Sequence, residues 1–411
     1  MNYKRLKLAC YSANVSMSVI ANISPILFIT FHDLYEIDYA LLGLLVLINF
    51  CTQLTIDLVF SFFSHRFNIP KTVRFTPILC IVGLCFFAAA PLLFPNDIYL
   101  GLVLATIIFS ASSGLAEVLM SPLIATIPAE NPEREMSKLH SVYAWGVVGV
   151  VLFATFFLSI FKSTNWQYLV LIFALIPLLS AVLFSSVEIP KMKTSEKASV
   201  AVSFMKNKLL WLSVFAIFLA GASECTMSQW SSAYLEKALN IPKIYGDVFG
   251  VALFGFSLGL GRTLYGKYGK NVEKVLLLGS VGAAICYLVA ALSEFAIVGL
   301  LACAFTGFFV SMLWPGNIVI ASDRFSSGGV LVFALMAAGG DLGCSIGPQL
   351  VGTLTDCVIA SNGMIEFAQS LGMSLEQLGM RIGLLAGAGF ALLGIVVGYF
   401  LLKAKKKEIT E

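Results

Sequence analysis

The sequence predicts an all-helical (all-α) membrane protein in which twelve transmembrane helices form two pseudo-symmetric six-helix bundles. Three observations lead to this fold class: the composition, the length of the apolar segments and the distribution of Lys and Arg. Of the 411 residues, 59% are hydrophobic and 12% are charged, and the mean hydropathy is +0.91. Soluble domains carry about 25% charged residues. The composition therefore excludes a water-soluble globular protein.

Twelve apolar segments are long enough to cross a bilayer, which takes about 20 helical residues. The first follows MNYKRLK and is too long for the core of a signal peptide, so we expect it to be retained as a span. The longer segments must tilt or extend past the hydrocarbon. In chain order the segments cover residues 8–31, 39–63, 73–94, 98–127, 138–161, 166–186, 208–235, 245–265, 274–293, 296–321, 328–356 and 381–403.

The positive charges predict the orientation of these spans. If the N-terminus is cytoplasmic, 22 of the 26 Lys and Arg residues lie in cytoplasmic segments or helix ends, as the positive-inside rule requires. Only an even number of spans gives this bias. We therefore expect a multi-pass protein of the cell (inner or plasma) membrane with both termini cytoplasmic, and an extracytoplasmic loop at 358–380. The four exceptions are Lys162, Lys237, Lys243 and Arg381.

The longest basic connection, EIPKMKTSEKASVAVSFMKNK, follows the sixth span. It predicts an N-terminal six-helix bundle at 1–187, a cytoplasmic linker at 188–207 and a C-terminal six-helix bundle at 208–411. Two halves of six suggest an internal repeat. The short loops after spans two and eight, at 65–68 and 266–269, both combine basic, aromatic and turn-forming residues.

Sequence motifs for catalysis or metal binding are absent. The nine cysteines form no CxxC pair and read as small buried hydrophobes. There are three histidines and no HExxH, P-loop or GxSxG motif. We expect no enzyme activity, no metal, no cofactor and no nucleic-acid partner. Without an ATP-binding motif, any pumping must use an ion gradient.

An acidic residue lies near the middle of the fourth span, TIIFSASSGLAEVLMSPLIATIP. A carboxylate at that depth costs about 2.5–3.5 kcal/mol on insertion scales. Ser113, Glu117 and Ser121 are spaced by four and share one helix face. Glu117 is either a neutral carboxyl bonded to a neighbouring helix or a proton site in a water-accessible cavity. We predict that Glu117 couples transport to protons.

The seventh span carries a second acid beside groups suited to a sugar. Glu224, Ser228 and Ser231 share a face, with Gln229 and Trp230 one step round it. An indole offers a flat apolar face to ring C–H groups, and an amide pairs with hydroxyls. We predict proton coupling for Glu224 and solute binding for Gln229 and Trp230. The alternative is an interface aromatic beside a helix–helix hydrogen bond.

The tenth span repeats the pairing of an indole and an amide in Trp314 and Asn317, which are separated by Pro315 and Gly316. Proline and glycine break the backbone ladder where a transporter helix lines a cavity, so these residues either bind solute or form a hinge. The remaining candidates for solute binding are Asn22 in the first span and Asn49 and Gln53 in the second.

Four further residues are expected to have gating or structural roles. Asp57 is expected to be buried against Arg66 or Arg74, and His140 lies near the membrane surface at the start of span five. Asp341 follows two glycines in span eleven, where it caps a kinked helix or bonds nearby loops. The candidates in this group are Asp57, Arg66, His140 and Asp341.

Together, the twelve spans, the central basic loop and the two short loops resemble the major facilitator superfamily, which implies the major facilitator fold. The loop motif of that superfamily is Gly-x3-Asp-Arg/Lys-x-Gly-x-Arg/Lys. Residues 61–71 read SFFSHRFNIPK, with Ser for the first Gly, His for the Asp and Asn for the second Gly.

Three longer stretches are similar to the fucose–galactose–glucose:proton symporter branch, a sugar permease family. They are AEVLMSPLIATIPAENPEREMSKLHSVYAWG, GFFVSMLWPGNIVIA and GGDLGCSIGPQLVGTLTD. In that family the span-four Glu is a protonation site, which implies this role for Glu117. The family's sugar-contacting Asp of span one has no match in the stretch ANISP at 21–25.

The resemblance implies a secondary active transporter that moves a small polar solute, a sugar or related metabolite, with protons by alternating access. We expect a monomer in the lipid bilayer. One alternative is a drug or metabolite:proton antiporter, which usually has Gly-x-x-x-Gly-Pro in span five, whereas this chain reads GVVGVVLFATFF. The other is a non-transport membrane sensor, which would need an output domain, whereas nine residues follow Leu402.

Overall fold

The computed structural model describes residues 3–63, 66–128, 132–190, 207–325 and 329–410. Within these ranges the regular structure is entirely helical. Eleven of the described helices are long and apolar enough to cross a membrane, or twelve if the pair α1 (Tyr3–Ile26) and α2 (Phe28–Tyr35), bent by 42°, is one span. The bend follows Pro25, which has no N–H to donate to the preceding turn.

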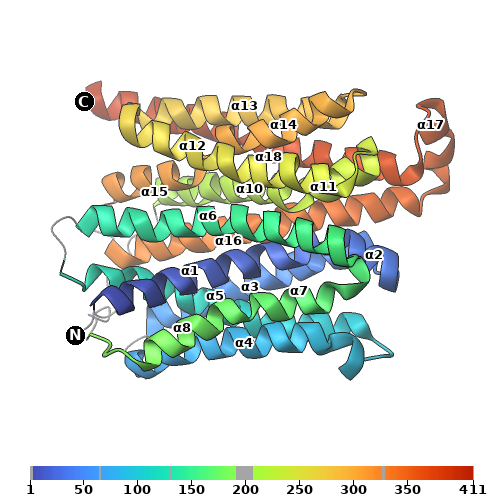
Figure 1. Ribbon diagram of the computed structural model, residues 1–411. Helices are drawn as coiled ribbons and strands as arrows, with labels where there is room; N and C mark the ends of the chain where they lie inside the picture. Colours follow the sequence, from blue (N-terminus) through green and yellow to red (C-terminus); the bar gives the residue numbers. More distant parts are fainter. Residues whose placement is uncertain (1–2, 64–65, 129–131, 191–206, 326–328, 411) are drawn as a thin grey trace. The chain divides into compact units, whose positions relative to one another are not determined.

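The chain divides into two compact units. Unit 1 consists of residues 1–37 and 48–198. In it α1 runs along α6, α8 and α5, and α4 packs on α5 and α8 (Figure 1). Besides α1 and α2, the helices are α3 from residue 48 onward (α3 is Tyr39–Phe63), α4 (Ile69–Leu93), α5 (Ile98–Ala125), α6 (Pro132–Phe161), α7 (Trp166–Phe173) and α8 (Leu175–Ser185).

Aromatic side chains fill one part of the unit 1 core. The Trp166 ring is fully buried and meets the rings of Phe31 and Phe87 edge-on at 5.0 and 5.7 Å. Its indole N–H donates to the Tyr35 hydroxyl at 3.0 Å. An edge-to-face arrangement is the favoured geometry of such rings, and the hydrogen bond satisfies a donor that burial would otherwise strand.

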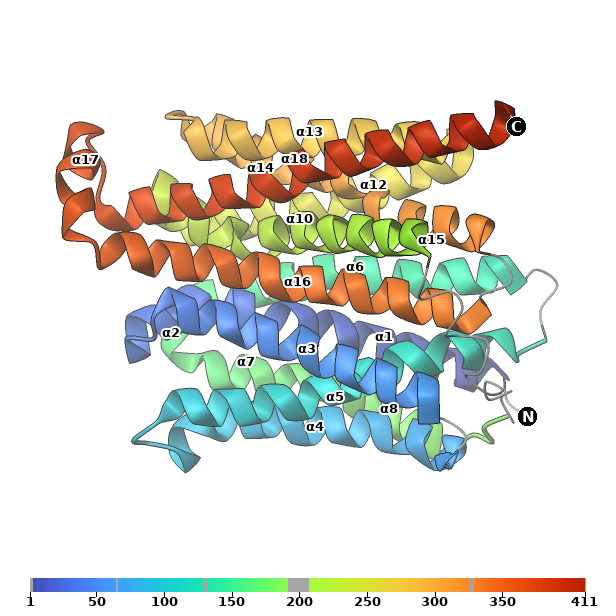
Figure 2. The ribbon, with the colours of Figure 1, turned by 180° about the vertical axis from the view of Figure 1, so that it is seen from behind.

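Unit 2 consists of residues 38–47 and 199–411. Helices α10, α16 and α18 run alongside one another in it (Figures 1 and 2). The helices of this unit, apart from the start of α3, are α10 (Lys208–Leu239), α11 (Lys243–Tyr245), the π-helix η4 (Gly246–Ala252), α12 (Leu253–Tyr268), α13 (Val272–Leu292), α14 (Ala296–Val310), α15 (Leu313–Arg324), α16 (Gly329–Ile359), α17 (Ile365–Ser370) and α18 (Leu375–Thr410).

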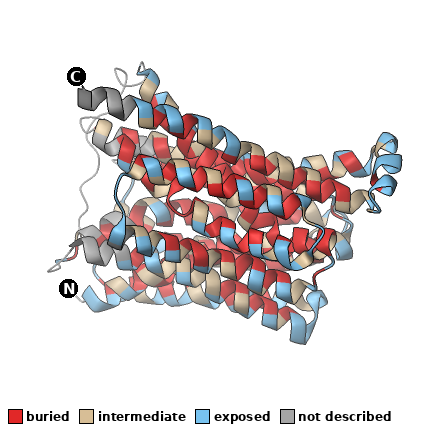
Figure 3. Cartoon of the chain, turned by 90° about the horizontal axis from the view of Figure 1, so that it is seen from above, coloured by how far each residue is buried: buried red, intermediate tan, exposed pale blue. Residues whose placement is uncertain are grey.

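Glycine allows α10 and α16 to approach closely. A Cβ atom at Gly221 would collide with the carbonyl oxygen of Gly340, and one at Gly343 would collide with that of Phe218. Small residues let backbones come together inside membranes, where packing drives helix association. In Figure 3, buried residues run along much of the length of the helices.

The start of α3 belongs to unit 2, whereas the sequence-based division placed all of residues 1–187 together. The Ala40 N–H donates to a carboxylate oxygen of Asp356 at 2.6 Å, so the acid acts as a cap for the helix N-terminus. Gln349 donates to the Ala40 carbonyl at 3.1 Å. Gly352 is needed at this contact, because a Cβ there would collide with the Tyr39 carbonyl oxygen.

The segment expected to be a loop at 358–380 contains helical structure. It includes a short 3₁₀ turn at Asn362–Met364, α17, and the first residues of α18. Helix α18 begins early because Ser374 and Gln377 form a capping box, in which each side chain accepts from the other residue's backbone N–H at 3.1 and 3.0 Å. Most of the expected linker (residues 191–206) and His65 lie outside the described residues.

We predict that Gly221→Ala destabilises the protein, because the new methyl group meets backbone on α16 that cannot yield. Overpacking of this kind typically costs about 1–3 kcal/mol, so the unfolding temperature in detergent should fall. Gly389→Ala is the matched control, since a Cβ at Gly389 in α18 meets nothing within 4 Å. Equal unfolding temperatures for both variants would contradict the proposed tight contact.

Candidate functional site

A polar cluster joins α3 and α5 inside unit 1. The Asn49 side-chain oxygen accepts from the Ser110 hydroxyl at 2.6 Å and from the Gln53 amide at 3.1 Å, and all three side chains are buried. Asn49 and Gln53, which the sequence analysis assigned to solute binding, thus bind each other and a neighbouring helix in this structure. Their role toward a solute stays a prediction.

One turn further along α3, a second carboxyl accompanies Glu117. Helices α3 and α5 touch here, since a Cβ at Gly114 would lie 3.0 Å from the Gln53 carbonyl oxygen. The carboxyl groups of Asp57 and Glu117 consequently lie within electrostatic range of each other. Asp57 is 8% exposed, whereas Glu117 is exposed. Two acids therefore lie near the contact between α3 and α5.

The basic residues expected to pair with Asp57 have other contacts. Arg74 donates to the carbonyl oxygens of Phe184 and Val187 at 3.3 and 3.2 Å, at the end of α8. The Arg66 guanidinium lies over the Phe63 ring, 5.4 Å from its centre. The charged neighbour of Asp57 across the α3–α5 contact is therefore an acid, Glu117. Arg74 instead donates to carbonyl oxygens at the C-terminal end of α8, where a positive charge is favoured by the helix dipole.

The polar stripe of the first span ties α1 to α6. The Asn14 amide donates to the Leu139 carbonyl at 2.9 Å, and the Ser18 hydroxyl donates to the Tyr143 carbonyl at 2.8 Å. Asn22, a predicted solute-binding residue, is buried and donates to the Ser18 carbonyl at 2.8 Å. The hydrogen bonds of Asn14 and Ser18 therefore hold α1 against α6, whereas that of Asn22 lies within α1.

A groove of about 610 Å³ opens between α1 and α6. Trp145 is 65% exposed in it, and Lys138 and Ser141 lie on the same face of α6. The groove combines a flat aromatic face, hydroxyl groups and an ammonium group, which suits a small polar solute. The lining residues of α6 recur three or four positions apart, and this spacing is the sequence signal that could have predicted the groove. Its lining residues are Tyr11, Val15, Lys138, Ser141, Val142, Trp145 and Gly146.

In unit 2, Glu224 has a partner that the sequence analysis missed. The Arg262 guanidinium lies 3.5 Å from a carboxylate oxygen of Glu224, and the two side chains are 38% and 22% exposed. Cys344 of α16 lies within electrostatic range of Glu224 and of Asp341. The sequence analysis had counted Arg262 among the cytoplasmic charges. An acid and a cation inside spans commonly pair with each other and mark functional paths.

Trp230 and Gln229 are both buried on α10. The Trp230 indole N–H donates to the Pro348 carbonyl at 2.9 Å, and its ring meets Tyr39 edge-on. A solute could reach Trp230 only after these contacts separate. In the conformation described here the residue packs α10 against α16 and the start of α3.

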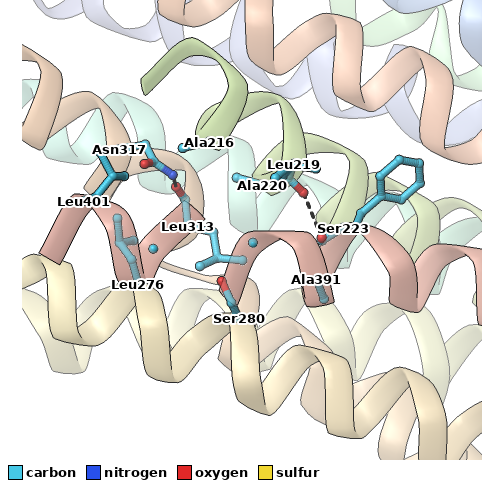
Figure 4. Close-up of a pocket in the computed structure, with 13 residues that line it drawn as sticks. Ala216, Leu219, Ala220, Ser223, Leu276, Ser280, Leu313, Asn317, Ala391 and Leu401 are labelled. Carbon is cyan, nitrogen blue, oxygen red and sulfur yellow. Dashed lines mark hydrogen bonds between the residues drawn. The ribbon is translucent and has the colours of Figure 1, made fainter. Parts of the chain in front are cut away.

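Asn317 and Trp314 of the tenth span face different surroundings. The Trp314 ring packs against Gly340, where a Cβ would collide with it. Asn317 lines a small cavity of about 20 Å³ with Ser280 and Ser223, shown in Figure 4. This volume suits one water molecule and is too small for a sugar ring. The Asn317 amide donates to the Leu313 carbonyl at 2.7 Å, while its oxygen has no hydrogen-bond partner.

Asp341, a candidate for gating, is buried on α16. The side chain of His140, another such candidate, lies outside the described residues. Among the residues that the structure describes, His, Cys, Asp and Glu side chains do not gather in groups of three that could hold a metal ion.

Comparison with known families identifies the fold. The model of the Major Facilitator Superfamily matches residues 9–348. The chain belongs to this superfamily. The all-helical architecture with eleven or twelve apolar spans agrees with the superfamily's twelve-helix fold, which confirms the predicted fold class. A sequence search of curated proteins finds no match.

Solved structures of other transporters share this major facilitator fold. A bacterial homolog to the human lysosomal transporter Spinster has a TM-score of 0.74 at 14% identity, covering 98% of this chain and 97% of its own. A D-xylose-proton symporter has a TM-score of 0.73 at 16% identity, with the same coverages. The E. coli fucose:proton symporter has a TM-score of 0.61 at 15% identity, covering 96% and 98%. The family and these neighbours indicate a transporter rather than an enzyme.

We predict that Trp230→Phe and Trp145→Phe differ in their effect on stability. The first removes a buried hydrogen bond to the Pro348 carbonyl and should cost about 1–3 kcal/mol, because the carbonyl loses its buried donor. The second changes a largely exposed ring and should cost less than about 0.5 kcal/mol. Thermal unfolding of both variants in the same detergent checks this prediction, and similar losses would contradict it.

Proposed function

We propose that this major facilitator protein is a secondary active transporter that carries a small polar solute, a sugar or related metabolite, together with protons by alternating access. Membership of the superfamily supports transport of a small solute. Among the structural neighbours, the D-xylose and fucose transporters are named as proton symporters. We further propose a monomer in the cell (inner or plasma) membrane with both termini cytoplasmic, on the distribution of Lys and Arg.

The observation that carries the proton coupling is the pair of carboxyl groups on α3 and α5. Both lie in apolar spans, where a lone carboxylate is costly. Glu117 is exposed, and Asp57 is buried on the neighbouring helix. In the proposed cycle, Glu117 takes up a proton from water on the outer side and releases it inside.

For the solute we propose the groove between α1 and α6. The Tyr11 and Trp145 rings offer flat apolar faces to ring C–H groups, and the Ser141 hydroxyl offers a donor and an acceptor. Asn22, Asn49, Gln53, Gln229, Trp230, Trp314 and Asn317 remain candidates for another conformation of the cycle, since several of them are buried here.

A drug or metabolite:proton antiporter and a non-transport sensor are the alternatives. The direction of proton movement separates all three. In proteoliposomes with a pH-sensitive dye trapped inside, a symporter acidifies the lumen when solute is added outside, an antiporter makes it more alkaline, and a sensor changes nothing. The solutes to add are D-xylose, L-fucose, D-galactose, D-glucose and nucleosides, after a thermal-shift screen with the same set.

We predict that Glu117→Gln abolishes solute-driven acidification, because the amide cannot carry a proton. Exchange of labelled solute across the membrane without a gradient should continue, since it needs no net proton movement. Glu366→Gln, at an exposed acid on α17, is the control and should behave as the wild type. Undiminished acidification by Glu117→Gln would rule out the proton role.

A further inference from the structure

The tenth span is broken, and the sequence explains where. Helix α14 ends at Val310 and α15 begins at Leu313. In a continuous helix, the N–H of residue 315 would donate to the carbonyl of residue 311. Residue 315 is proline, which has no N–H. Pro315 therefore cannot donate to the Ser311 carbonyl.

Arg262 of α12 supplies the missing donor. Its Nε–H donates to the Ser311 carbonyl oxygen at 3.0 Å. The two helices come this close because residue 261 is glycine, and a Cβ there would collide with the Ser311 hydroxyl. An arginine on a neighbouring helix thus completes the backbone hydrogen bonding that Pro315 interrupts, as a spanning segment requires.

The same guanidinium reaches a carboxylate. A terminal nitrogen of Arg262 lies 3.5 Å from Glu224 on α10. One side chain therefore connects an acid on one span with the break in another. The side chains are partly exposed, at 38% for Arg262 and 22% for Glu224. On the far side of the break, the Trp314 ring rests on Gly340, next to Asp341.

Another titratable group also lies near Glu224. Cys344 of α16 is within electrostatic range of Glu224, and its own further neighbours are Cys225 of α10 and Asp341 of α16. From α13, the Tyr287 hydroxyl donates to the Ser223 carbonyl at 2.6 Å. At this level α18 presents Gly387, which has no side chain to titrate. Among these named groups, Arg262 is the cation.

We propose that Arg262 is a positioning residue that links the charge of Glu224 to the break in the tenth span. When Glu224 is ionised, the guanidinium is held between the carboxylate and the Ser311 carbonyl. When Glu224 is protonated, its ionic attraction to Arg262 is lost. Arg262 can still donate to the Ser311 carbonyl, but its guanidinium is then held less firmly. The break then opens more readily. The inference rests on the proposed function only in taking protonation of Glu224 as a step of transport.

Hydrogen–deuterium exchange of the purified protein in lipid nanodiscs tests this link without a solute or a gradient. At one pH, Glu224→Gln, which mimics the protonated acid, should speed exchange in peptides spanning residues 311–317 about fivefold. Arg262→Gln should do the same, and the double variant should be no faster than either single variant, because both break one chain of contacts. Glu366→Gln serves as the control.

A rescue variant separates this role from general damage. Pro315→Ala restores an N–H four residues after Ser311, so Arg262→Gln combined with Pro315→Ala should exchange at about the wild-type rate. If Arg262→Gln does not fold, Arg262→Lys can replace it. Lysine keeps the positive charge but lacks the planar guanidinium that donates in two directions at once, so the exchange rate at 311–317 should lie between those of the wild type and Glu224→Gln. A rise with Arg262→Gln but not with Glu224→Gln would overturn the proposal and leave Arg262 as a fixed cap.

The pH response provides a second test. Relative to an unstructured reference peptide, exchange at 311–317 in the wild type should rise as the pH falls from about 7 to about 3.5, a range that includes the ordinary pKa of a glutamate carboxyl, about 4.3. In Glu224→Gln this pH response should disappear. A response that persists would assign it to another group around Glu224 and overturn the link. If the Glu117→Gln transport test fails, the hydrogen–deuterium exchange results can still be interpreted, because the exchange measurement does not require transport.

Discussion

Inside a bilayer a polar group has no water to bond, and the internal contacts of this protein follow from where each such group finds a partner. Helices satisfy their own backbone, and side chains then join one helix to the next. The Ser12 hydroxyl donates to the Ile176 carbonyl, and the Tyr287 hydroxyl donates to the Ser223 carbonyl. The Arg381 guanidinium donates to the Ala291 carbonyl. Each such bond contributes about 1 kcal/mol net, but leaving its buried partner unsatisfied costs more.

Close backbone approach makes these bonds possible. Gly146 brings α6 against Ser18 of α1, and Gly261 brings α12 against Ser311 at the break in the tenth span. In each case a short polar side chain or a carbonyl oxygen lies at the contact. Small residues and polar bonds therefore occur together, since a larger side chain would hold the donor and the acceptor apart.

The two units surround their acids with different neighbours. In unit 1, the charged neighbour of Asp57 is another acid, Glu117. In unit 2, the charged neighbour of Glu224 is the guanidinium of Arg262, 3.5 Å away. A proton arriving at the first site relieves a repulsion, whereas a proton arriving at the second weakens an attraction. Under the proposed function, these are two distinct responses to one ion gradient.

The sequence by itself determined the all-helical fold and the apolar spans, because each depends on the length and composition of a continuous segment. The tertiary structure decided which side chains meet. Trp230 donates to a carbonyl 118 residues away, and Glu224 pairs with an arginine on another helix. Hydrophobicity specifies that a residue is inside the membrane, but the partner that it contacts depends on how distant helices pack, which no local pattern records.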